Sequence, residues 1–233
     1  MFERMLLSGT AGGKEKGRYR GLFNRPIIAS DGGVDWYGEV SAEELISGNA
    51  LASLIGLRAG TAQHSDAGWL HVGLDGTELL IAKRPLRRSI AWDNIQNVDA
   101  VFGSREIEIK DQRYKIRLAK GAALASNTIT SGWDNAQTHG CEWNRIFYRL
   151  TNEVYVNALN NKASEDGFIH LANYSEEDLV LDQYYGKGSY SWCQEKSQAY
   201  RLRRGGRGVS FAYRYASSVA LDDNGWRPVL ERV

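Results

Sequence analysis

The sequence has few cysteines and prolines, no long apolar run and almost no net charge. Its two cysteines, Cys141 and Cys193, cannot build a disulfide framework and lack the Cys-x-x-Cys spacing of a zinc site, so we expect buried free thiols. No apolar run approaches the roughly 20 residues that cross a bilayer. The apolar patch near the first residue is too short for a secretory signal, which favours synthesis in a reducing cytosol. Lys and Arg total 29 against 28 Asp and Glu. So neutral a balance gives no overall attraction to nucleic acid or to anionic lipid, and we expect neither a nucleic-acid partner nor membrane insertion.

Glycine and aromatic residues are abundant instead. The 233 residues include 25 glycines, 7 tryptophans and 12 tyrosines but only 3 prolines. Many glycine turns and large rings are typical of a strand-rich domain with long loops and a core built on the rings. The length suits one large domain with a short appendage.

The appendage is predicted at residues 1–28, where five glycines interrupt any periodicity. The segment holds six basic residues against two acidic ones. We interpret it as an extended basic arm that docks onto a partner protein; a merely solvated tail is the alternative. The residues expected to contact the partner are Arg4, Lys14, Lys16, Arg18 and Arg20. Residues 29–233 then form the folded domain.

Two β-hairpins and two helices are predicted in the domain. Alternating segments at 69–82 and 105–118 each surround a turn dipeptide. The predicted turns are Asp75-Gly76 and Asp111-Gln112. A Ser41-x-x-Glu44 capping box predicts the start of one helix, and apolar residues at three- and four-residue spacing predict the other at 141–159.

The C-terminal part adds further candidate strands. They are predicted at 190–194, 199–203, 209–215 and 226–230. Strands in pairs with helices between them indicate an α+β fold and not a parallel βαβ arrangement.

Motifs for catalysis and metal binding are missing. A phosphate-loop-like run at 9–14 has Ser8 in place of the first glycine and Glu15 in place of the magnesium ligand. No Gly-x-Ser-x-Gly turn occurs, and the four histidines lack His-x-x-x-His spacing. We predict no catalytic residue, no metal site and no cofactor.

Two charged regions have a structural and a functional interpretation. Arg201, Arg203, Arg204 and Arg207 could bind phosphate or an acidic glycan, but we favour a structural role in which guanidinium groups bond loop carbonyls. The acidic stretch 164–185 is interpreted as a solvated loop, with a cation site as the alternative.

Three motifs follow one another in the C-terminal part of the chain. They are Tyr-Ser-Trp-Cys-Gln-Glu at 190–195, Tyr-Arg-Leu-Arg-Arg-Gly-Gly at 200–206 and Gly-Trp-Arg-Pro-Val-Leu at 225–230. Their order, together with Cys-Glu-Trp-Asn-Arg at 141–145, resembles the formylglycine-generating-enzyme branch of the C-type lectin fold. The likeness covers residues 69–233 and implies a C-type-lectin-like fold of antiparallel hairpins packed with two helices. That branch needs a cysteine pair beyond its Arg-Gly-Gly, and residues 207–215 contain no cysteine. We therefore predict that the protein is not an enzyme.

Four further motifs resemble structural proteins of tailed bacteriophages. They are Gly-Trp-Leu-His-Val at 68–72, Trp-Asp-Asn-Ile at 92–95, Trp-Asn-Arg at 143–145 and Gly-Trp-Arg-Pro-Val-Leu-Glu at 225–231. This resemblance implies a virion protein of the tail or its tip, made in the host cytoplasm. It further implies contact with other virion proteins, homo-oligomers in the particle and contact with a host glycan or protein.

The two resemblances together suggest a rigid frame that carries loops. The expected frame residues are Trp143, Trp192, Arg204, Trp226 and Arg227. The expected contact loops are 119–140, with Trp133 and Asn135, and 213–225, with Tyr213 and Tyr215.

Alternatives stay open at this point. In one, Trp133 is a core residue and the loops bury against neighbouring subunits. In a second, the protein is a metal-dependent oxygenase relative of the same fold, with His139 and His170 as the only nearby imidazoles. In a third, it is a stand-alone carbohydrate-binding module that stacks Trp133 or Tyr213 on a sugar.

Overall fold

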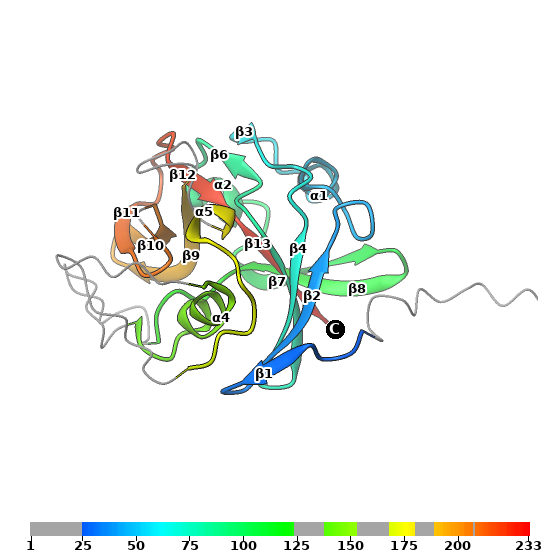
Figure 1. Cartoon of the computed structure of the whole chain (residues 1–233). Helices are drawn as coiled ribbons and strands as arrows, with labels where there is room; N and C mark the ends of the chain where they lie inside the picture. The colour runs from blue at the N-terminus through cyan, green and yellow to red at the C-terminus, as the bar shows by residue number, and fades with distance from the viewer. Residues whose placement is uncertain (1–24, 124–137, 153–167, 180–188, 207) are drawn as a thin grey trace, which may run out of the picture.

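The structure is a computed structural model that describes residues 25–123, 138–152, 168–179, 189–206 and 208–233 (Figure 1). Over these residues the fold is α+β and mostly β-sheet, as the sequence predicted. The strands form two sheets, which we call sheet A and sheet B.

Sheet A has seven strands in the order β1-β2-β4-β5-β13-β8-β7, and each neighbouring pair is antiparallel. Its strands are β1 (Ala29–Asp31), β2 (Val34–Val40), β4 (Trp69–Leu74), β5 (Thr77–Ala82), β7 (Phe102–Ile109), β8 (Gln112–Leu118) and β13 (Pro228–Arg232). The C-terminal strand β13 lies between the hairpins β4–β5 and β7–β8 and joins them into one sheet.

Sheet B has six strands in the order β11-β10-β9-β12-β6-β3. Its strands are β3 (Thr61–Ala62), β6 (Arg87–Arg88), β9 (Tyr190–Ser197), β10 (Tyr200–Gly205), β11 (Ala212–Ala216) and β12 (Asn224–Trp226). The pair β12–β9 is parallel and the other pairs are antiparallel. The predicted strand at 226–230 is therefore divided: Arg227 separates β12 in sheet B from β13 in sheet A.

Both predicted hairpins form, but the second turn lies one residue earlier than expected. Asp75 and Gly76 have φ angles of 50° and 81°, as the first prediction required. In the second hairpin the positive φ angles belong to Lys110 (51°) and Asp111 (63°), and Ile109 pairs with Gln112. Lysine is an unusual residue for this backbone region, so the sequence pointed to the wrong pair.

The predicted helix start at Ser41 was wrong, although its capping box forms. The Ser41 hydroxyl accepts from Glu44 N at 3.0 Å, and the Glu44 carboxylate accepts from Ser41 N at 2.9 Å, yet a turn follows instead of a helix. The helix α1 (Gly48–Leu54) begins later, with Ser47 as its N-cap. The short helix α2 (Trp92–Gln96) lies between the two hairpins of sheet A in the sequence.

The longest described helix, α4 (Glu142–Leu150), is shorter than the predicted 141–159. Thr151 has an extended backbone, and its hydroxyl donates to the carbonyls of Phe147 and Tyr148. This side-chain bonding competes with helix continuation. The fourth described helix, α5 (Glu176–Leu179), lies in the acidic stretch that was interpreted as a loop.

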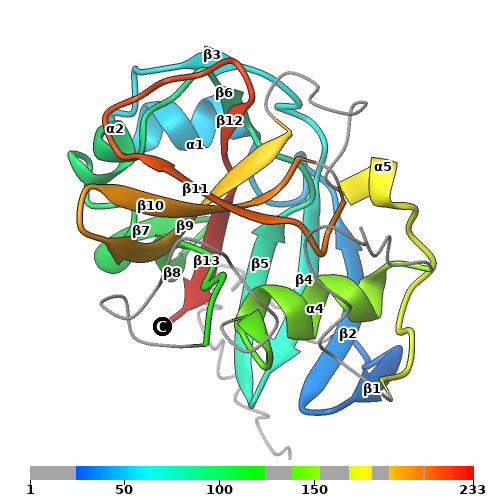
Figure 2. The same ribbon diagram turned by 90° about the vertical axis from the view of Figure 1, so that its left-hand side faces the viewer.

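Sheet A is covered on both faces by packed side chains. Successive residues of each strand point to opposite sides and so contribute to two separate clusters. Leu80, Ile116 and Leu230 contact a core cluster that includes α1, α2 and two sheet B tryptophans. Leu79, Ile81 and Val229 contact a second cluster around α4. Figure 2 shows α4 lying across β4 and β5. Both cysteines are buried thiols in the second cluster, as predicted, and neither is part of a disulfide.

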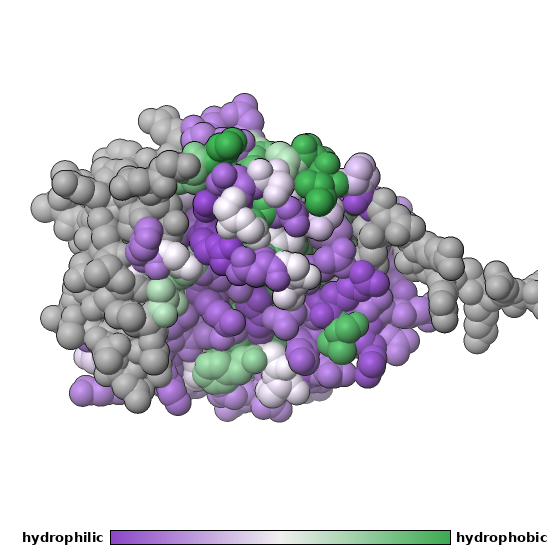
Figure 3. Space-filling model, turned by 90° about the horizontal axis from the view of Figure 1, so that it is seen from below, coloured by the Kyte–Doolittle hydropathy of each residue, from purple (hydrophilic) through white to green (hydrophobic). Residues whose placement is uncertain are grey.

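No described helix has the length and apolar character needed to cross a bilayer. Seen from below, the coloured surface is mostly hydrophilic with separate hydrophobic spots (Figure 3).

Candidate functional site

Several predicted contact residues lie outside the described residues. They are Arg4, Lys14, Lys16, Arg18, Arg20, Trp133 and Asn135. The last four residues assigned to the arm, 25–28, are described and contact the body. Arg25 donates to the Glu39 carbonyl at 2.7 Å and to the Glu44 carboxylate at 2.8 Å, and Ile28 N donates to the Trp36 carbonyl.

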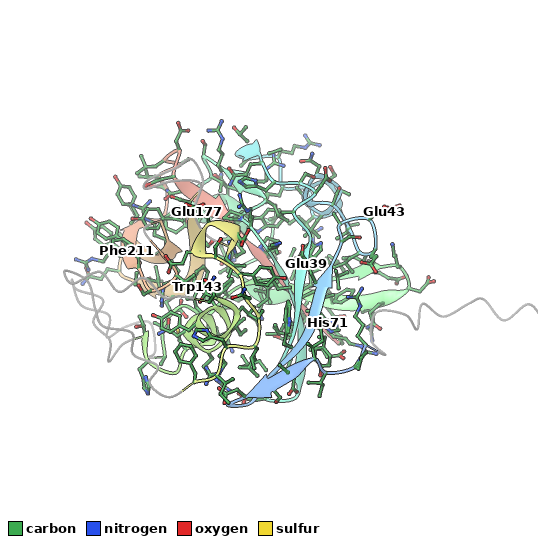
Figure 4. All side chains as sticks on the ribbon, viewed as in Figure 1. Glu39, Glu43, His71, Trp143, Glu177 and Phe211 are labelled. Atoms are coloured by element: carbon green, nitrogen blue, oxygen red, sulfur yellow. The ribbon has the colours of Figure 1, made fainter. Side chains whose placement is uncertain are left out.

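The three frame tryptophans are all in the interior, each at most 1% exposed. Trp143 Nε1 donates to the Val209 carbonyl and Trp192 Nε1 to the Ile90 carbonyl, both at 2.8 Å. Each of these bonds ties a ring to a distant segment of chain. Figure 4 shows Trp143 on α4, facing the middle of the molecule.

Two buried arginines lie against Trp143. The guanidinium carbon of Arg204 is 5.6 Å from the ring centroid and that of Arg227 is 5.5 Å from it. Arg204 donates to the Gly121 carbonyl at 2.7 Å and to Asn144 Oδ1 at 2.6 Å. Arg227 donates to the Leu179 carbonyl, and burial lowers its pKa to about 9, with a further contribution from nearby Arg84.

These contacts favour the structural interpretation of the arginine cluster. Arg201 donates to the Gln198 and Tyr200 carbonyls, and Arg203 donates to Asp223 and Asn224. Within the described part of the chain the guanidinium groups thus contact carbonyls, side-chain oxygens and rings of the protein itself. Arg207 lies outside the described residues.

Acidic residues near α5 also have internal partners. Ser175 and Asp178 form a capping box at its start, with Ser175 N donating to the Asp178 carboxylate at 2.9 Å. Arg84 donates to the Glu177 and Asp178 carbonyls at its end, where a cation is favourable. Glu176 accepts from Val209 N at 3.0 Å. In the residues that the structure describes, no group of three His, Cys, Asp or Glu side chains could hold a metal ion.

The two ends of the predicted contact loop 119–140 meet beside the start of α4. At one end, Glu142 accepts from Lys120 N at 3.2 Å, and both oxygens of Glu195 accept from Gly121 N at 3.0 Å. At the other end, the Thr138 carbonyl accepts from Asn144 Nδ2 at 3.0 Å and from Cys141 N.

We call this set the α4 anchor: Arg117, Gly121, Thr138, Glu142, Asn144, Glu195 and Arg204. Its two carboxylates, Glu142 and Glu195, have different hydrogen-bond donors. Glu142 forms a two-bond ion pair with Arg117, both bonds at 2.8 Å. Among the described residues, Glu195 accepts from backbone donors, and burial raises its pKa to about 7. A buried network of this kind fixes positions strongly, because each buried polar group needs its partner.

The second predicted loop, 213–225, begins as a strand. Tyr213 and Tyr215 lie on β11, two residues apart, so they share one face of sheet B. Arg203 on β10 is the cross-strand partner of Tyr213. Its guanidinium carbon lies 5.3 Å from the Tyr213 ring centroid, 4.8 Å from that of Tyr215 and 3.8 Å from that of Tyr190. Tyr213 is 47% exposed.

We call this region the tyrosine face: Tyr190, Arg203, Phe211, Tyr213 and Tyr215. The rings of Phe211 and Tyr213 stack with an interplanar angle of 13°, and Phe211 lies at the left of Figure 4, at the outer side of sheet B. The exposed ring of Tyr213 is therefore held by its neighbours before any partner arrives. Aromatic groups with little conformational freedom to lose are effective contact residues.

The sequence predicted Arg204 as a frame residue but not the other charged members of the α4 anchor, which are Arg117, Glu142 and Glu195. Glu142 and Glu195 lie inside the motifs at 141–145 and 190–195, whose order carries the resemblance without assigning either carboxylate a role. A buried charge needs a specific partner, and here the partners lie far along the chain.

No family model matches this chain, and neither a curated protein nor a solved structure is significantly similar to it.

Proposed function

We propose that the protein is a non-enzymatic structural component of a tailed-bacteriophage particle, built on a C-type-lectin-like frame that carries contact loops. The observation that carries the proposal is the α4 anchor. It places both ends of the 119–140 segment on one buried network, next to a frame of buried tryptophans. An architecture that fixes loop ends this firmly suits a protein whose role is to hold a contact surface in place.

The arm supplies the docking part of the proposal. Its excess of basic residues suits an acidic surface of another virion protein. Because Arg25 bonds to Glu39 and Glu44, a deletion that tests docking should stop at residue 24 and leave those bonds intact.

The experiment compares particles from cultures that express the full chain or a variant. The full chain should appear in purified particles at a fixed ratio to the capsid protein, measured by quantitative mass spectrometry. A variant without residues 1–24 should be lost from particles while its near-ultraviolet circular dichroism stays unchanged. A matched variant with glutamine at the five basic arm positions separates charge from chain length. Absence of the full chain from particles would refute the virion role.

A stand-alone carbohydrate-binding module is the second candidate, favoured by the exposed ring of Tyr213. Such a ring can stack on a sugar, and its loss typically removes binding. Glycan-array signals that disappear in Tyr213→Ala and persist in Tyr200→Ala would support it. Arrays without signal for the unmodified protein would count against it.

A further inference from the structure

Strand β11 is the edge of sheet B among the described strands, and it lies at the left margin of the molecule in Figure 1. Figure 2 looks onto that side and shows β10 and β11 at the front. An edge strand carries a row of backbone groups that no neighbour has paired, and proteins usually protect such rows.

The other three edge strands of the two sheets, among the described strands, are short or protected against further pairing. β1 has three residues and β3 has two. β7 is longer, but its pairing with β8 shifts register between Phe102 and Arg105, and it exposes Glu106 and Glu108. Bulges and charges of this kind discourage the addition of another strand. β11 pairs with β10 without a shift over five residues.

The pairing pattern shows which backbone groups of β11 point outward. Gly205 N donates to the Phe211 carbonyl and Ser217 N to the Ala199 carbonyl. In an antiparallel pair the bonded residues alternate, so Tyr213 and Tyr215 bond to β10. The N–H and C=O groups of Ala212 and Arg214, and the N–H of Ala216, point away from the sheet. The Ala216 carbonyl accepts from Val219 N within the same chain.

The side chains beside this edge define the chemistry of an added strand. Arg214 points to the face opposite the tyrosines, where its guanidinium lies 4.9 Å from the Tyr200 ring centroid. No carboxylate of the described residues forms an ion pair with it. A residue directly opposite Arg214 on an added strand would share its face, so a carboxylate there is favoured. The residues on either side of that carboxylate would lie beside Tyr213 and Tyr215, where β-branched residues fit.

A second copy of this chain is a poor occupant. Antiparallel pairing of two β11 strands in full register places Arg214 opposite Arg214, which is unfavourable. A shift of two residues relieves the repulsion but leaves only three residues paired, too few for a stable addition.

We propose that β11 accepts an extended segment of another protein by strand addition, and that this segment carries an acidic residue flanked by β-branched residues. The proposal deepens the contact role given above but does not depend on the phage setting. Backbone bonds to Ala212, Arg214 and Ala216 supply binding, and the carboxylate opposite Arg214 supplies selectivity.

The test uses two capped peptides and the full chain labelled with nitrogen-15. One peptide is Thr-Val-Glu-Val-Thr and the other is Thr-Val-Lys-Val-Thr. The Glu peptide should bind in the millimolar range, because a short strand must be ordered on binding. It should move and protect the amide signals of Ala212, Arg214 and Ala216 and leave the protection of Tyr213 and Tyr215 unchanged. The Lys peptide should bind about tenfold more weakly.

Charge reversal provides the decisive variant. Arg214→Glu should reverse the preference between the two peptides, and Arg113→Glu, an exposed change on β8, should leave it unchanged. Equal binding of both peptides, shifts confined to signals away from β11, or no binding of either peptide would each overturn the proposal. None of these results bears on whether the protein is found in particles, so the two proposals fail separately.

Discussion

Arg117 in sheet A and Arg204 in sheet B are both buried, but their partners differ in charge. In sheet A, Arg117 on β8 is paired with the carboxylates of Glu142 and Glu231. In sheet B, Arg204 on β10 donates to a carbonyl and an amide oxygen and lies against a tryptophan ring. The difference matters for what remains after a substitution. Loss of Arg117 would leave an unpaired buried carboxylate, whereas loss of Arg204 would leave neutral acceptors.

Arg117→Met should have the largest effect. It leaves the buried carboxylate of Glu142 without its guanidinium, so we expect a loss of about 3–5 kcal/mol in unfolding free energy. Urea unfolding would measure this loss, provided that the dependence of unfolding free energy on urea concentration is the same in both proteins. Arg113→Met is the control, because Arg113 is 64% exposed beside Glu106 and should cost under about 0.5 kcal/mol. Similar losses for the two variants would contradict the contrast.

Glu195→Gln should change the pH dependence of stability. Burial raises the Glu195 pKa from 4.5 to about 7, so the folded state holds this proton more tightly than the unfolded chain does. The wild type should therefore lose about 3 kcal/mol at this site as the pH rises from 4.5 through 7. The variant lacks this loss, so its stability relative to the wild type should increase across that window.

His71 in sheet A should make stability depend on pH in the opposite direction, and a separate variant tests this. Burial lowers its pKa from 6.5 to about 4, so stability is lost as the pH falls from 6.5 to 4. We expect about 2 kcal/mol after allowance for solvent screening. The two slopes oppose each other below pH 6.5, so the wild-type curve should be flatter than that of either Glu195→Gln or His71→Gln. Equal curves for all three proteins would show that neither group titrates as described.

Arg204→Met should cost less than Arg117→Met. The Gly121 carbonyl and Asn144 Oδ1 lose a donor, which we expect to cost about 2 kcal/mol. Thermal or urea unfolding of both variants under one buffer gives the comparison. A loss as large as that of Arg117→Met would mean that the charge of the partner does not set the cost of losing a buried arginine here.

Arg227→Met should have the smallest effect. Within the described part of the chain, Arg227 makes one hydrogen bond, to the Leu179 carbonyl, and its charge is unfavourable in a buried site. Methionine preserves contacts with the rings of Trp143 and Phe147. We expect a change between zero and a gain of about 1 kcal/mol. A loss above about 3 kcal/mol would indicate a charged partner for Arg227.

The sequence predicted local structure better than it predicted the site. Asp75-Gly76 located its hairpin because the turn depends on two adjacent residues. The Ser41 capping box forms without a helix, since capping satisfies a first turn but does not supply the packing that continues it. The burial of Glu142 and Glu195 depends on partners far along the chain, including Arg117 and Gly121, and no short pattern reveals such pairs.

The position of β13 has a consequence for biosynthesis. The hairpins β4–β5 and β7–β8 leave the ribosome early, but they become one sheet only when β13 enters between them. Synthesis of residues 228–232 is therefore required before the two hairpins can join. A nascent chain halted before that point would leave the facing edges of β5 and β8 without the strand that they share.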